Sequence, residues 1–106
     1  MSVQTRLLER IRCIDCKAEE FDRQGYSVKA DTGSWSRPPV TEGIKLDIRA
    51  SRGDQEIIGK VLRPDELETC EKDFEKLIKY AGERDNTSFR IYYISEDEKP
   101  ILHKIF

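Results

Sequence analysis

Three residues in two neighbouring segments are of the types that metal-dependent hydrolysis uses, two carboxylates and a lysine. Asp47 lies in segment 45–50, and Glu56 and Lys60 lie in segment 56–62. Two carboxylates that converge on a hard cation, with a lysine to orient or deprotonate a water, form such a site. Glu56 and Lys60 are four residues apart and share one face of an extended strand. Strand parity permits, and nothing in the sequence requires, a site in which Asp47 and Glu56 hold Mg²⁺ or Mn²⁺ and Lys60 positions the water. These three are the candidate catalytic residues.

The elements that must position these residues follow from the spacing of the apolar side chains. Steps of four and three predict a helix over Val3–Arg23, ended by Gly25. Its buried stripe is Leu7, Ile11, Ile14, Ala18 and Phe21. The alternation in Tyr26–Ala30 predicts a half-buried strand, which a Gly- and Pro-rich loop follows.

Segment 44–50 has a strict period of two, which predicts a second strand. Its apolar face is Ile44, Leu46, Ile48 and Ala50, and its exposed polar face is Lys45, Asp47 and Arg49. A tight turn at residues 51–54 leads into a third strand, Glu56–Leu62, and completes a hairpin.

The second half of the chain is predicted to form a helix, a strand and a tail. Pro64 and the acidic residues after it open the helix, and Gly82 ends it. The apolar run Phe89–Ile94 predicts a buried strand, and Ile101–Phe106 is a short apolar tail. The fold class is therefore α/β, with a small mixed sheet of four strands flanked by two helices and a parallel pair between the third and fourth strands.

This order of elements, with Asp47 on the second strand and Gly59-Lys60-Val61 on the third, resembles the restriction-endonuclease-like (PD-(D/E)xK) superfamily. The resemblance spans roughly residues 19–94 and implies the topology α-β-β-β-α-β. In that superfamily an aspartate on the second strand and a (D/E)xK tripeptide on the third bind a divalent metal and an attacking water. Asp47 matches the first position, although Leu46 stands where proline is usual. In this register glycine stands in place of the second carboxylate and Val61 in place of the lysine. A shift by one residue, to Ile58-Gly59-Lys60, recovers the lysine and still lacks the acid.

The resemblance therefore implies a nuclease-like domain with an incomplete catalytic set. We expect a non-catalytic module that binds nucleic acid or assembles with protein, including as a homodimer. The alternative is an active Mg²⁺- or Mn²⁺-dependent DNA nuclease in which Glu56, or Glu19 or Glu20 of the first helix, supplies the missing acid. A third possibility is a scaffold unrelated to nucleases. The candidate nucleic-acid-binding residues are Lys29, Trp35, Arg37, Lys45, Arg49 and Arg52.

Size and composition limit these possibilities. The 106 residues fit a single domain, 1–106, and the net charge of −2 provides no overall positive field for a polyanion. No apolar stretch approaches the ~20 residues of a membrane span. Three cysteines without a framework of spacings fit a reducing compartment, so we expect a cytoplasmic protein.

Cys13 and Cys16 form one Cys-x-x-Cys pair, and the helical stripe predicts that both point away from the buried face. A structural zinc normally needs four ligands, so this single pair is a weak signal and we do not expect zinc. The open alternatives are a partner surface that covers the thiols, half of a metal site shared between subunits, or incidental thiols. His103 and Trp35 are more simply structural, although Trp35 could stack on a base.

Overall fold

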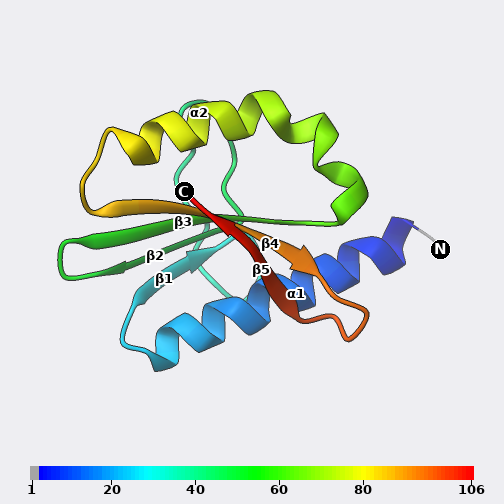
Figure 1. The fold of residues 1–106 in the computed structure, drawn as a ribbon. Helices are drawn as coiled ribbons and strands as arrows, with labels where there is room; N and C mark the ends of the chain where they lie inside the picture. The colour runs from blue at the N-terminus through cyan, green and yellow to red at the C-terminus, as the bar shows by residue number, and fades with distance from the viewer. Residues whose placement is uncertain (1–2) are drawn as a thin grey trace.

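Two helices cover opposite faces of one five-stranded sheet, whose strands follow each other in chain order. The computed structural model describes residues 3–106, with side chains from residue 5 onward. Figure 1 shows α1 below the sheet and α2 above it. The elements are α1 (Val3–Arg23), β1 (Ser27–Ala30), β2 (Ile48–Arg52), β3 (Gln55–Leu62), α2 (Glu71–Gly82), β4 (Thr87–Ile94) and β5 (Pro100–Ile105).

The sheet is mixed, as the sequence predicts. Strands β1, β2 and β3 pair antiparallel, β3 and β4 pair parallel, and β5 returns antiparallel to β4. The parallel pair is joined through α2, which provides the crossover that parallel strands need. The α/β class, the two helices and the parallel pair are confirmed, but the prediction of four strands is wrong.

The fifth strand is the segment that the sequence presents as an apolar tail. A bulge hides its period, because Leu102 pairs with Tyr92 and Lys104 pairs with Ile91, which leaves His103 as an extra residue. The aromatic ring of His103 stacks on Tyr93, with ring centroids 4.3 Å apart. A strand with a bulge lacks regular alternation, so periodicity alone does not reveal it.

The face of the sheet toward α1 buries a core in which Cys13, Ile14, Ala18 and Phe21 of the helix meet the strands. The prediction for Cys13 is wrong, because its side chain is completely buried. Leu7, which we expected on the buried stripe, is 55% exposed. Compared with the predicted stripe, the face of α1 that contacts the sheet is rotated toward Cys13. The first turns of α1, which include Leu7, extend beyond that core.

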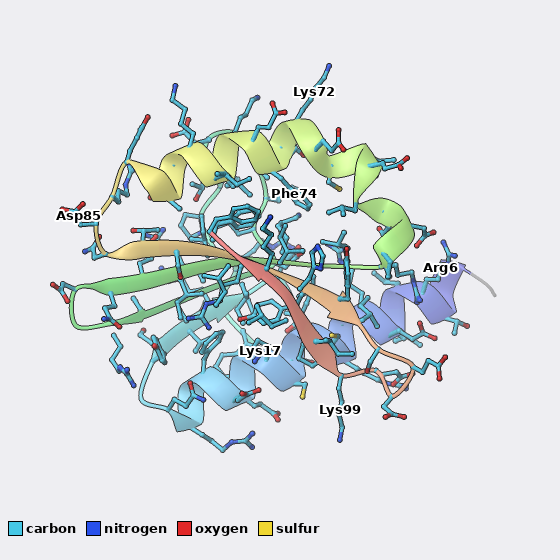
Figure 2. The ribbon with its side chains drawn as sticks, in the orientation of Figure 1. Arg6, Lys17, Lys72, Phe74, Asp85 and Lys99 are labelled. Atoms are coloured by element: carbon cyan, nitrogen blue, oxygen red, sulfur yellow. The ribbon has the colours of Figure 1, made fainter. Side chains whose placement is uncertain are left out.

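The opposite face of the sheet packs against α2 through Phe74, Leu77 and Ala81. Figure 2 shows Phe74 pointing from α2 toward the sheet, and its ring lies 5.6 Å from that of Phe89. Two 3₁₀ turns, Pro64–Glu66 and Glu68–Cys70, precede α2. The helix that the sequence places at Pro64 therefore begins as these turns. Neither α1 nor α2, the helices of residues 3–106, meets the length and apolar character of a membrane span.

The second strand is shorter than its alternation predicts. Ile44 and Leu46 pack in the α2-side core, whereas Ile48 and Ala50 pack in the α1-side core. The chain bends at Asp47, and β2 starts at Ile48. The four apolar residues therefore do not share one face, because the bend changes the parity of the side chains.

Candidate functional site

Asp47 lies where three segments of backbone meet. Its amide donates to the carbonyl of Gly59 at 3.1 Å, and its own carbonyl accepts from the amide of Asp31 at 2.9 Å. Gly59 permits this close approach, since a Cβ at that position would lie 2.6 Å from Cγ2 of Ile48. The junction holds the Asp47 side chain inside the protein, and only 3% of the residue is exposed. The expectation of an exposed Asp47 is therefore wrong.

Both carboxylate oxygens of Asp47 accept short hydrogen bonds. Nη2 of Arg10 donates to Oδ1, and the backbone amide of Val61 donates to Oδ2, both at 2.7 Å. A buried carboxylate requires such partners because its desolvation is costly. Asp47 is thus compensated by groups of the protein itself.

Lys60 lies beside the same carboxylate. Its Nζ is 3.7 Å from Oδ2 of Asp47 and donates to the carbonyl of Lys45 at 3.0 Å. The Lys60 side chain is 15% exposed, and that of Arg10 is 28% exposed. The structure therefore brings together the predicted acid and lysine, and it adds the guanidinium of Arg10, which the sequence did not point to.

Glu56 does not join this group. Asp47 lies beside Gly59 and Lys60, whereas Glu56 pairs with Ser51, four residues or about 13 Å further along the hairpin. Oε2 of Glu56 accepts from Nη2 of Arg49 at 2.9 Å. The two candidate metal ligands are therefore separated.

The first helix does not supply a replacement acid at the expected positions. Glu19 is exposed, and Glu20 pairs with Lys17 at 3.1 Å. The acidic residue of α1 at this end of the molecule is Glu9, and it is bonded to Arg63. In residues 3–106 no three His, Cys, Asp or Glu side chains gather as metal ligands. With Arg10 and Val61 on its oxygens, Asp47 does not fit the oxygen-rich shell that Mg²⁺ needs.

Two of the six candidate nucleic-acid-binding residues come together elsewhere, on the polar face of β1 and β2. Lys29 stands directly across from Arg49, and Ser27 stands across from Ser51. These four side chains line a shallow hollow of about 200 Å³. We call this set the β1–β2 polar face. Within the described side chains, Lys29 forms no ion pair and is exposed.

The other four candidates are dispersed. Trp35 packs against the α1-side core, so its ring is not a free stacking platform. Arg37 pairs with Asp31 at 3.3 Å. Arg52 lies over the ring of Tyr26, 4.4 Å from its centroid. Lys45 is exposed beside Lys60, at the opposite end of the hairpin from the polar face.

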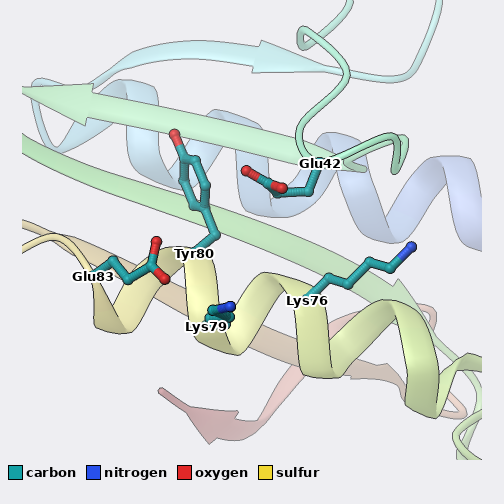
Figure 3. Close-up of a pocket in the computed structure, with 5 residues that line it drawn as sticks. All are labelled: Glu42, Lys76, Lys79, Tyr80 and Glu83. Atoms are coloured by element: carbon teal, nitrogen blue, oxygen red, sulfur yellow. The ribbon is translucent and has the colours of Figure 1, made fainter.

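A second polar hollow, of about 290 Å³, lies between α2 and the loop before β2. Figure 3 shows Tyr80 pointing from α2 toward the sheet, with Glu42 of the loop nearby. Lys76, Lys79 and Glu83 complete the lining, so two lysines face two glutamates. These opposite charges compensate each other, and the hollow has less attraction for an anion than the β1–β2 polar face.

Burial makes Cys13 a poor metal ligand. It raises the pKa of this thiol from 9.0 to about 12, with a smaller contribution from Cys16. A metal-binding cysteine must be a thiolate, which this environment disfavours.

Sequence reasoning missed Arg10, Ser27 and Ser51. The two serines could have been found, because they lie two residues before Lys29 and two after Arg49 and so share a strand face with them. Comparison of the chain with models of protein families and with curated proteins gave no match.

Proposed function

We propose that the chain is a restriction-endonuclease-like domain that does not hydrolyse its ligand and binds the phosphate backbone of a nucleic acid. The order of α1, β1, β2, β3, α2 and β4 supports the nuclease-like part of the proposal. So does the contact between Asp47, just before β2, and Lys60 on β3. Strand β5 is an addition at the edge of that arrangement.

The loss of hydrolysis is supported by the partners of Asp47. A metal at this carboxylate would have to displace Arg10, leaving a guanidinium beside the bound cation. It would also lack a second carboxylate, since Glu56 is held by Arg49. These contacts stabilise the fold where an active nuclease would hold its metal.

The β1–β2 polar face is the observation that carries the binding part. Lysine and arginine donate charge-assisted hydrogen bonds to phosphate oxygens, and serine hydroxyls add neutral ones. Lys29 and Arg49 bring two positive charges to the hollow, and Glu56 compensates one of them. The local charge is therefore positive although the whole chain has a net charge of −2.

The test measures fluorescence anisotropy of a labelled DNA duplex and a labelled single strand over a series of KCl concentrations. Lys29→Gln should weaken duplex binding about fivefold, which corresponds to about 1 kcal/mol for one charged contact. It should also reduce the slope of log affinity against log salt by about 0.9.

Lys72→Gln is the matched control, because Lys72 is an exposed lysine on α2 and Figure 2 shows it pointing away from the sheet. This variant makes the same chemical change away from the β1–β2 polar face. Equal losses in both variants, or no salt-sensitive binding by the wild type, would refute the proposal.

An active nuclease is the second candidate, and the 3.7 Å contact between Asp47 and Lys60 favours it. Supercoiled plasmid and branched DNA, incubated with the protein in Mn²⁺, provide the test. We expect no cleavage. Cleavage by the wild type that disappears in both Asp47→Ala and the nearly isosteric Asp47→Asn would establish the enzyme instead.

A further inference from the structure

The two edges of the sheet are built differently. At one edge, β1 is four residues long, it alternates polar and apolar side chains, and the amide of Ala30 is bonded to the carbonyl of Ser36 in the following loop. Short, polar, covered edges of this kind prevent further pairing. At the other edge, β5 has a strand neighbour on one side only, β4.

The β5 edge is unusually apolar for a free surface. Ile101 is 55% exposed, Leu102 is 46% exposed and Ile105 is 49% exposed. Aliphatic side chains next to unpaired backbone groups form a template for another strand. Three of the five residues 101–105 are therefore exposed aliphatic residues on a strand with one strand neighbour.

A groove of about 400 Å³ runs beside this edge, between β5 and α2. Its floor is apolar, formed by Leu67, Phe74, Ile78, Ile91 and Phe106. Glu71 and Glu75 line it from α2, and His103 and Lys104 line it from β5. A strand added to β5 would thus meet an apolar floor and acidic side chains.

We propose that the occupant of this edge is a second copy of the chain, so that the β5 strands of two protomers pair antiparallel and join both sheets into one. A two-fold axis makes such a contact self-complementary, because each patch meets its own counterpart. The partner strand would lie about 4.8 Å beyond β5. Its Lys104 brings positive charge toward Glu71 and Glu75, which line the same groove, and its aliphatic side chains cover those of the first protomer.

The bulge at His103 favours a second copy over a regular foreign strand. A bulge increases the local twist of a strand. A second β5 carries the same bulge and therefore the same local twist.

Sedimentation equilibrium over a wide range of protein concentration tests this dimer. The wild type should approach twice the mass of the chain as the concentration rises. Lysine at both edge positions, in Ile101→Lys/Ile105→Lys, should weaken dimerisation about a hundredfold, or tenfold for each aliphatic side chain replaced. Val40→Lys is the control, because Val40 is a 61% exposed aliphatic residue in the loop before β2.

Hydrogen exchange identifies the surface and also shows whether each variant is folded. Amides of β5 should exchange faster on dilution of the wild type, while those of β1 should not change. A wild type that stays monomeric, a dimer whose β5 amides are insensitive to dilution, or equal dissociation by Val40→Lys would overturn the proposal. No nucleic acid is used, so failure of the dimer and failure of phosphate binding are separate results.

Discussion

The guanidinium of Arg10 donates a 2.7 Å hydrogen bond to the carboxylate of Asp47, and this contact links the first helix to the start of the second strand. The two residues are 37 positions apart in sequence. Their contact neutralises the buried carboxylate of Asp47, whose other oxygen accepts from the amide of Val61. In the nuclease-like domain proposed above, this guanidinium would take the place of the catalytic metal ion.

Removal of Arg10 should destabilise the fold. Arg10→Met keeps much of the aliphatic stem but leaves the Asp47 carboxylate with Lys60 and the amide of Val61 alone. Loss of one partner of a buried pair costs about 3–5 kcal/mol. Because Arg10 is partly exposed and Lys60 stays in place, we expect a loss of about 2 kcal/mol in urea unfolding.

Arg12→Met provides the comparison for this measurement. Arg12 is on the same helix and pairs with Glu98, but its side chain is 61% exposed. Exposed ion pairs contribute little to stability, so this variant should unfold close to the wild type. Equal destabilisation by the two substitutions would show that Arg10 acts only through helix packing.

Divalent metal should not stabilise the protein beyond the effect of ionic strength. A ligand that binds only the folded state raises its stability in proportion to the logarithm of its concentration over its dissociation constant. Because Asp47 is occupied by Arg10, thermal unfolding in MnCl₂ should match that in NaCl of equal ionic strength. A higher midpoint in Mn²⁺ that Asp47→Asn abolishes would instead reveal a metal site.

Gly59 should tolerate no side chain. Its Cβ would lie 2.6 Å from Cγ2 of Ile48, inside the buried sheet, so Gly59→Ala should cost about 1–3 kcal/mol from overpacking. Ile48→Ala removes the clashing methyl. In a double-mutant cycle of urea unfolding, the two changes together should therefore cost less than the sum of the single changes. Strict additivity would contradict the close contact.

Much of the element order could be predicted, because each element has a local signal. The stripe in Val3–Arg23 and the apolar run in Phe89–Ile94 match α1 and β4. The signal fails where tertiary contacts override the local period. A bend at Asp47 changes the faces of β2, and a bulge at His103 disguises β5.

The candidate site depends on which turn of α1 contacts Asp47. Only a comparison of the length of the helix with the length of the strand that follows it indicates this turn. From Tyr26 to Asp31 the chain advances about 17 Å, and a helix covers the same length in about 11 residues. Counting about 11 residues back from Arg23, the last residue of α1, reaches the turn near Arg10 and Arg12. Glu19 and Glu20 lie too close to the end of the helix to reach Asp47.

Cys13 should be the least reactive of the three cysteines. Its side chain is completely buried, whereas Cys16 and Cys70 are half-buried. The thiolate is the reactive form, and burial raises the pKa of Cys13 to about 12. A thiol reagent at neutral pH should therefore modify Cys16 and Cys70 first, and Cys13 only after unfolding in urea. Peptide mapping by mass spectrometry identifies the order.

The same burial predicts how stability depends on pH. The pKa of Cys13 is higher in the folded protein than its ordinary value of 9.0, so the neutral thiol favours the folded state below 9.0. This contribution is lost as the pH rises from 9.0 toward about 12. Cys13→Ala has no such titration and should cost about 1 kcal/mol at neutral pH from the lost packing. The deficit in unfolding free energy of Cys13→Ala relative to the wild type should therefore shrink above pH 9.0. A difference in unfolding free energy between wild type and Cys13→Ala that stays constant across this pH range would contradict the raised pKa of Cys13.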